Sequence, residues 1–313
     1  MASPNSNFDQ IASSTLRNYL NNKFSDNVFN GHPFYAWINK NGRKVTEDGG
    51  EFLVEPLMWN NNETTSWMGG YDTVSTDQQD GLTAAQFNWK MAGGSVTYSV
   101  LEDAKNSGRH QVINLLNAKI EQCKTSMIDM FDEDLFLDGT ADSNNAITGL
   151  GAMVETGTYG NIAGATHTWW NAYEENTASV LNEDDMRIAF NTVSKNRTKP
   201  DLIITTQALF QKYESLVLPS YRTENLKMAD LGFTNLAFKG VPIIYDDYCP
   251  SGVMFFLNSE FMKLRVSKGN DFAWTDKREP TNQFVFSMLT RWIGNLTCSA
   301  RRFQGKLTAR TAS

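Results

Sequence analysis

The stretch INLLNAKIEQCKTSMIDMFDEDLFLDGT, residues 113–140, decides the fold because it holds the strongest helical pattern of the chain. Its apolar residues recur alternately three and four positions apart, which is the spacing of one face of an α-helix. Gly108 and Gly139 bound this pattern. We expect a helix over about residues 108–137, which at 1.5 Å per residue is about 45 Å long and lies along a sheet. The predicted buried stripe is Ile113, Leu115, Leu116, Ile120, Cys123, Met127, Met130, Phe131 and Leu135.

The segment before this helix has the composition of a long β-hairpin. Asn, Gly, Thr and Asp dominate residues 39–80, and short apolar runs interrupt them at 51–57 and 67–71. A return strand is expected at 85–90. Two strands cannot bury large apolar side chains between themselves, so a neighbouring chain has to cover them. The predicted intersubunit contacts are Phe52, Val54, Leu57, Trp59, Trp67 and Tyr71.

The segment after the helix alternates helical and strand patterns. Acidic residues at 183–185 lead a helix that ends near residue 194, and an apolar strand follows at 200–206. A helix at 208–216 and strands at 241–245, 253–257 and 284–291 complete this pattern. Such an order predicts a compact α/β lobe. A short amphipathic run at 8–19 predicts an N-terminal arm, because a helix of this size needs an outside surface.

Composition places the chain among folded, non-membrane proteins. Its 313 residues are 41% hydrophobic and 12% aromatic, which is enough for at least two packed lobes. The net charge of -7 argues against a protein that grips nucleic acid over a large surface. No apolar run is long enough to span a bilayer, and no secretory signal follows Met1. Cys123, Cys249 and Cys298 are widely spaced, so we interpret them as buried apolar residues.

We predict no catalytic residue, no cofactor and no metal site. His32, His110 and His167 stand alone, and nucleophile-elbow, phosphate-loop and dinucleotide motifs are missing from the sequence. The most enzyme-like feature is aromatic, because Trp169–Trp170 with Tyr173, and Trp59 with Trp67, could stack sugars. The preferred interpretation is that these rings fill a core or a subunit interface.

Several strings, taken in order, resemble the major capsid protein of tailed bacteriophages, which has the Hong Kong ninety-seven coat fold. No single string is specific, but their order and spacing cover nearly the whole chain. They are GGEFLVEPL at 49–57, GYD at 70–72, AAQFNWK at 84–90, LEDAKNSG at 101–108, ITGL at 147–150 and GNLTCSARR at 294–302.

This resemblance implies an α+β fold with named regions. Residues 1–30 would be the N-terminal arm, and residues 31–94 the extended β-hairpin loop that lies across a neighbouring subunit. Residues 95–199 would form the peripheral domain around the long spine helix. Residues 200–265 would form the α/β axial domain, and residues 266–313 would return as strands to the peripheral domain.

The resemblance also implies a function in assembly. The expected product is an icosahedral head of hexamers and pentamers, assembled in the host bacterial cytoplasm, that encloses double-stranded DNA without sequence-specific contacts in the virion. Expected partners are a portal protein, a separate scaffolding protein and, optionally, a decoration protein. Because the arm begins almost at Met1, no built-in scaffolding segment and no processing beyond Met removal are expected.

Two alternatives remain at this stage. An encapsulin-like compartment shares the coat fold but encloses protein cargo in place of DNA. A carbohydrate-active enzyme, which is the less favoured alternative, would use the Trp and carboxylate clusters and would purify as a monomer or dimer. Electron microscopy separates the second alternative from both shell proteins, because only a shell protein forms uniform hollow particles.

Overall fold

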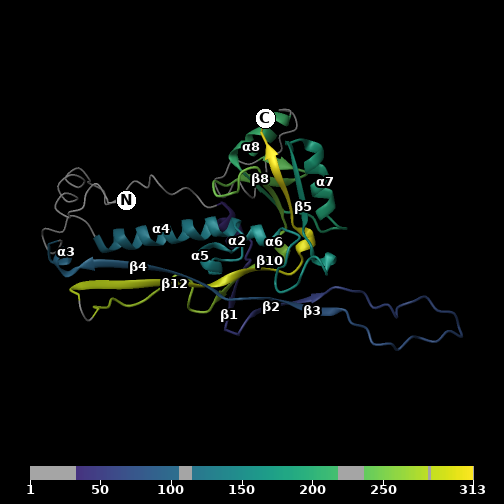
Figure 1. Ribbon diagram of the computed structural model, residues 1–313, viewed down its shortest axis with the longest axis horizontal. Helices are drawn as coiled ribbons and strands as arrows, with labels where there is room; N and C mark the ends of the chain where they lie inside the picture. The colour runs from purple at the N-terminus through teal and green to yellow at the C-terminus, as the bar shows by residue number, and fades with distance from the viewer. Residues whose placement is uncertain (1–32, 106–114, 218–235, 281–282, 313) are drawn as a thin grey trace. The chain divides into compact units, whose positions relative to one another are not determined.

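The structure is a computed structural model that describes residues 33–105, 115–217, 236–280 and 283–312 (Figure 1). The predicted arm at 1–30 and the start of the predicted long helix, 108–114, lie outside the described residues. No helix within the described ranges combines the length and the apolarity that crossing a bilayer requires.

The described residues form two compact units. The first unit contains Met91–Phe131 and Gly269–Ile293, and the second contains His32–Lys90, Asp132–Lys268 and Gly294–Ser313. Three elements contribute residues to both units, namely strand β4 (Lys90–Ser99), helix α4 (Leu115–Phe136) and strand β12 (Val285–Cys298).

The first unit places the long helix on a sheet. Helix α4 runs alongside β4 (Lys90–Ser99) and β12 (Figure 1). Strand β12 pairs with β4 and also, antiparallel, with β11 (Ala273–Trp274). Helix α3 (Val100–Lys105) follows β4. The long helix is therefore confirmed over its described part, and the strand predicted at 284–291 continues to Cys298.

A glycine allows helix α4 to lie directly on the sheet. A Cβ atom at Gly94 would lie 2.8 Å from the Cys123 sulfur and 2.9 Å from the Met127 sulfur, so only glycine fits there. Further along, the Phe131 ring packs edge-on against Trp292, with centroids 4.7 Å apart. The face of α4 that contacts the sheet thus follows residues four apart. The prediction that Met130 belongs to the buried stripe is wrong, because its side chain is 39% exposed.

The second unit contains a six-stranded sheet. Its strand order is β5-β13-β9-β6-β8-β7, and helices α7 (Glu183–Val193) and α8 (Gln207–Leu216) pack against it. The strands are β5 (Tyr173–Val180), β6 (Leu202–Thr205), β7 (Leu236–Phe238), β8 (Val241–Tyr245), β9 (Met254–Leu257) and β13 (Gly305–Thr311). Helix α7 starts where the Asn182 side chain accepts a hydrogen bond from the Asp185 N–H. The helices and strands predicted between residues 183 and 257 are confirmed.

The predicted boundaries of the axial domain, 200–265, are too narrow for this sheet. Strand β13 pairs in parallel with β5 and antiparallel with β9. Both β5 and β13 lie outside residues 200–265. Strand β13, from the segment predicted to return to the peripheral domain, pairs within this sheet. Pairing between strands more than 100 residues apart leaves no local signal in the sequence.

The predicted extended loop, 31–94, is too long. Helix α2 (Pro33–Lys40) precedes β1 (Lys44–Glu47), which is parallel to β10 (Met262–Ser267). Phe34 on α2 is fully buried, with its ring 5.4 Å from that of Phe136. These elements belong to the body of the second unit. Only β2 (Leu53–Met58), β3 (Leu82–Phe87) and the residues between them form the hairpin.

A buried arginine holds a turn of this unit together. Arg301, in the short helix η5 (Arg301–Phe303), is fully buried and donates hydrogen bonds to the carbonyl oxygens of Met153, Gly157, Ala152 and Glu155. These carbonyls lie in and just after helix α6 (Leu150–Met153). The guanidinium therefore occupies acceptors that the end of α6 leaves open. Helix α5 (Ala141–Asn144) and the short helices η2 (Thr168–Trp170) and η4 (Ser259–Phe261) complete the unit.

The burial of the three cysteines predicts the order in which their thiols react with a disulfide reagent. Cys249 and Cys298 are buried, as expected, whereas Cys123 is half-buried. Burial raises the pKa of the Cys298 thiol to about 12 and also raises the pKa of the Cys249 and Cys123 thiols. Little thiolate therefore forms near pH 8. We expect a disulfide reagent to modify Cys123 slowly and the other two only in denaturant; rapid titration of all three native thiols would contradict this burial.

Candidate intersubunit surface

Strands β2 and β3 form an antiparallel ribbon with a fixed register. Leu53 pairs with Phe87 at one end and Met58 with Leu82 at the other. Side chains alternate between the two faces along β2, so one face is buried and the other is exposed. The residues between the strands, 59–81, are named the hairpin tip (Figure 1).

The inner face of the hairpin packs on its own chain. Phe87 lies edge-on to Tyr159, with ring centroids 4.9 Å apart. Gly160 has a φ of +61°, and a Cβ atom there would lie 2.8 Å from the Ala85 Cβ. Leu57 is 5% exposed on this inner face. The prediction that Leu57 contacts a neighbouring subunit is therefore wrong, because strand alternation turns it inward.

A buried ionic cluster anchors the base of the hairpin. The Glu55 carboxylate, on the inner face, pairs with Arg265 and lies 3.5 Å from the Lys263 ammonium. It also accepts a hydrogen bond of 3.0 Å from the Thr297 hydroxyl. Arg265 makes a second ion pair, of 3.0 Å, with Glu47. The hairpin is thus joined to β10 and β12 by charge as well as by apolar packing.

The outer face of the hairpin is apolar and uncovered. Met58 is 79% exposed and its cross-strand partner Leu82 is 72% exposed. Phe52 and Val54 are also exposed, as predicted. The sequence analysis missed Met58 and Leu82, although Met58 stands four residues after Val54 and therefore shares its face in a strand.

The hairpin tip carries the largest exposed rings. Trp67 and Tyr71 are fully exposed, and Met68 and Val74 are also exposed. Trp59, at the start of the tip, differs, because its ring stacks on Trp169 of the same chain at 5.9 Å. Large exposed apolar patches of this kind mark interaction surfaces in soluble proteins. Trp67 and Tyr71 are therefore free to contact a partner, whereas Trp59 is partly held by its own subunit.

Of the aromatic residues considered for sugar stacking, Trp169 is in ring contact with Trp59 and Trp170, whereas Trp67 lies apart on the hairpin tip. Trp170 is buried, and its indole N–H donates to the Tyr159 carbonyl at 3.0 Å. Trp169 is covered on one side by Trp59, while Trp67 is exposed on the hairpin tip. Within the described ranges, no three His, Cys, Asp or Glu side chains gather closely enough to hold a metal ion. This geometry does not favour the carbohydrate-active alternative.

Comparisons with known proteins place this arrangement in one fold. No family model matches the chain, and no curated protein matches its sequence. The capsid of cyanophage A-1(L) superposes with a TM-score of 0.70 at 14% identity, covering 97% of this chain and 99% of that chain. The chain has the fold of tailed-phage capsid proteins. The predicted α+β class and the Hong Kong ninety-seven coat fold are thereby confirmed.

Two further solved structures show how widely this fold is used. The capsid of the Myoviridae phage XM1 has a TM-score of 0.57 at 14% identity, covering 93% of this chain and 96% of that chain. The SrpI encapsulin of Synechococcus elongatus has a TM-score of 0.60 at 9% identity, covering 93% and 94%. Phage capsids and an encapsulin therefore share this architecture.

Proposed function

We propose that this chain is a major capsid protein that self-assembles into an icosahedral shell enclosing phage double-stranded DNA. The observation that carries the proposal is the exposed hairpin, whose apolar outer face and aromatic tip have no cover within the described chain. The capsid fold over nearly the full chain supports it. In this proposal the hairpin is the extended loop, α4 is the spine helix and the six-stranded sheet is the core of the axial domain.

The physical basis of the proposal is repeated modest contacts. A closed shell surrounds each subunit with copies of itself, so every copy offers its hairpin and receives another. Trp, Tyr and Met are enriched at the centres of such contacts, and buried Trp and Tyr rings dominate their energy. Trp67 and Tyr71 are the residues expected to act in this way, together with Met58 and Leu82.

The proposed partners follow from a DNA-filled shell. Copies of the chain would form hexamers and pentamers, a scaffolding protein would guide assembly in the host cytoplasm, and a portal protein would occupy one vertex. A decoration protein is an optional addition. The net charge of -7 supports only weak contacts with the phosphates of packaged DNA, because strong binding to phosphates needs an excess of basic residues. The subunit would catalyse no reaction.

An encapsulin-like shell is the second candidate, because an encapsulin shares the fold over 93% of this chain. The contents of the particle distinguish a phage capsid from an encapsulin-like shell. Shells purified from the native host should hold nuclease-protected DNA in the first case and a folded cargo protein in the second. Negative-stain microscopy tests both, since dispersed particles of about 35 kDa under all assembly conditions would contradict either kind of shell.

Replacing both Trp67 and Tyr71 with Ala should impair assembly without unfolding the subunit. Each ring is fully exposed in the single chain, so its removal costs little folding energy. Burial of one such ring at an interface contributes about 2 kcal/mol, so the double variant should raise the concentration needed for half-maximal assembly by about 100-fold or more. Light scattering and microscopy measure that concentration, and circular dichroism checks the fold.

Thr73→Ala, an exposed change two residues after Tyr71 in the same tip, is the matched control and should assemble like the parent. Assembly of the double variant at the parent concentration would remove the hairpin tip from the interface. Unfolding of the soluble variant would instead show that these rings support their own subunit.

A further inference from the structure

The hairpin tip carries charge of one sign. It contains Glu63, Asp72, Asp77 and Asp80 and no Lys or Arg, a net charge of -4. All four side chains are exposed. Their recorded hydrogen bonds stay within the tip, where Asp72 accepts from the Gly69 N–H and Asp77 from the Ser75 hydroxyl. Among the described residues, none of the four forms an ion pair, so the tip offers uncompensated negative charge to its surroundings.

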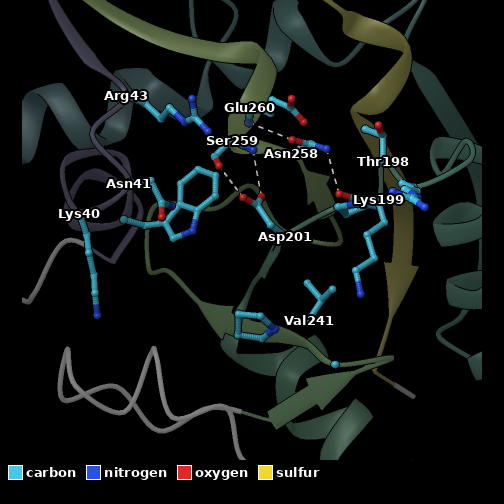
Figure 2. A pocket seen from close by; sticks show the side chains of 15 residues that line it. Lys40, Asn41, Arg43, Thr198, Lys199, Asp201, Val241, Asn258, Ser259 and Glu260 are labelled. Atoms are coloured by element: carbon cyan, nitrogen blue, oxygen red, sulfur yellow. Dashed lines mark hydrogen bonds between the residues drawn. The ribbon is translucent and has the colours of Figure 1, made fainter.

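A cavity in the second unit has the opposite character. Its volume is about 810 Å³, and it lies where the end of α2, the segment before β6 and the segment after β9 meet. Its described lining includes four basic and two acidic side chains, a net charge of +2. Figure 2 shows Lys40 and Lys199 reaching from opposite sides, with Asp201 between them. The charged residues are Lys40, Arg43, Arg197, Lys199, Asp201 and Glu260.

The two acidic side chains of this cavity compensate only part of its basic charge. Asp201 accepts two hydrogen bonds from Ser259, one from the backbone N–H at 2.9 Å and one from the hydroxyl (Figure 2). Burial raises the pKa of the Asp201 carboxyl, whereas these hydrogen bonds and the nearby Arg43 oppose that rise, so Asp201 compensates part of the positive charge. Arg197 and Lys199 are exposed and form no ion pair within the described part of the chain.

Arg43 adds a further basic side chain to this cavity. Its Nε atom is buried and has no hydrogen-bond partner among the described residues. A buried donor without an acceptor is uncommon in folded proteins, since it loses its contact with water and gains nothing in return. A concave surface with an excess of cations concentrates positive potential and attracts an anionic group.

We propose that the acidic hairpin tip of one copy docks in this basic cavity of a second copy. The inference rests on the proposed function, because the shell is what brings two copies together. Charge complementarity supports this occupant, since the tip is exposed, carries four acidic and no basic residues, and presents apolar rings that lack cover in the described chain. The contact gives the shell its pairing specificity, because like-charged arrangements of the same surfaces repel.

Charge reversal with rescue tests the contact. The tip variant is Asp77→Lys/Asp80→Lys, and the cavity variant is Arg197→Glu/Lys199→Glu. Each alone should raise the concentration for half-maximal assembly by about tenfold or more, because like charges then face each other. The chain that carries all four changes should assemble within about threefold of the parent, since the attraction is restored with its signs exchanged.

The matched control is Lys124→Glu/Arg302→Glu, which changes the net charge equally at two exposed residues outside the cavity. It should assemble like the parent. If the four-change chain fails as the separate variants do, the tip and the cavity are not partners. If the cavity variant assembles normally but retains less nucleic acid, the cavity serves phosphate groups and the proposal is overturned.

Crosslinking supplies an independent readout on parent shells. Shells assembled from an equal mixture of ¹⁴N-labelled and ¹⁵N-labelled chains are treated with a carbodiimide, which joins carboxylates to amines in contact. About half of the peptides that join residues 59–81 to Lys199 or Lys40 should combine one light and one heavy partner, whereas a crosslink within one chain would give none. Tip crosslinks confined to other lysines would overturn the inference while leaving the shell function intact. Failure of the parent to form any shell would instead overturn the proposed function, and the inference with it.

Discussion

Replacing Arg301 with Met is expected to lower the free energy of unfolding of the soluble subunit by about 3–5 kcal/mol. The guanidinium is fully buried and donates to four backbone carbonyl oxygens, three of them at 2.8 to 3.1 Å. It also lies against the faces of Tyr159 and Trp170, with its central carbon 5.0 and 5.9 Å from the ring centroids. A Met side chain fills part of this volume but donates no hydrogen bond, so buried carbonyls lose their partners.

The neighbouring arginine provides the control. Arg302 is exposed, so Arg302→Met should change the unfolding free energy by less than about 0.5 kcal/mol. Urea denaturation below the assembly concentration, followed by Trp fluorescence, measures both variants. Arg301→Lys should also be destabilised, because one ammonium cannot reach carbonyls arranged around a planar guanidinium. Equal stability of the Arg301→Met and Arg302→Met variants would show that the buried arginine contributes no net stability.

Replacing Glu55 with Ala is expected to cost about 2–4 kcal/mol and to loosen the base of the hairpin. The carboxylate is 2% exposed and compensates the positive charges of Arg265 and Lys263. Removing one member of a buried pair is costly because the other charge stays desolvated. Arg265 keeps its ion pair with Glu47, so the loss should lie near the lower end of this range.

Hydrogen exchange locates the effect. Amides of β2 and β3 should exchange faster in the Glu55→Ala variant, whereas those of β6 and β8 should be unchanged. Asp48→Ala removes an exposed ion pair with Lys268 from the same unit and should cost less than about 1 kcal/mol. Unchanged protection of the hairpin would show that apolar packing alone holds its base.

Local patterns predicted the elements that depend on neighbouring residues. The spacing of Met127 and Phe131 predicted the long helix, and the acidic start at 183–185 predicted α7. The alternation around Val54 predicted a hairpin with an exposed face, and the rings of Trp67 and Tyr71 are exposed, while their contact with a second subunit stays a prediction. In each case a helix or strand places its side chains with a fixed period, so the order of residues is enough.

Contacts between residues far apart in the sequence could not be predicted from local patterns. Nothing near Glu55 indicates that its partner is Arg265, since their sequence separation is 210 residues. Nothing in the sequence distinguishes Arg301 from its exposed neighbour Arg302. The acceptors of Arg301 are main-chain oxygens more than 140 residues away, and any residue type supplies such an oxygen. The inward turn of Leu57 likewise depended on which face of β2 meets the rest of the chain.

The sequence by itself thus determined the helices α4, α7 and α8, about half of the described strands, the hairpin and, through ordered resemblance, the capsid fold. The tertiary structure decided which strands share a sheet, which face of the hairpin stays exposed and where basic side chains converge. The physical reason is that secondary structure follows from local periodicity, whereas a site such as the cavity around Lys199 and Arg43 forms only when distant segments fold together.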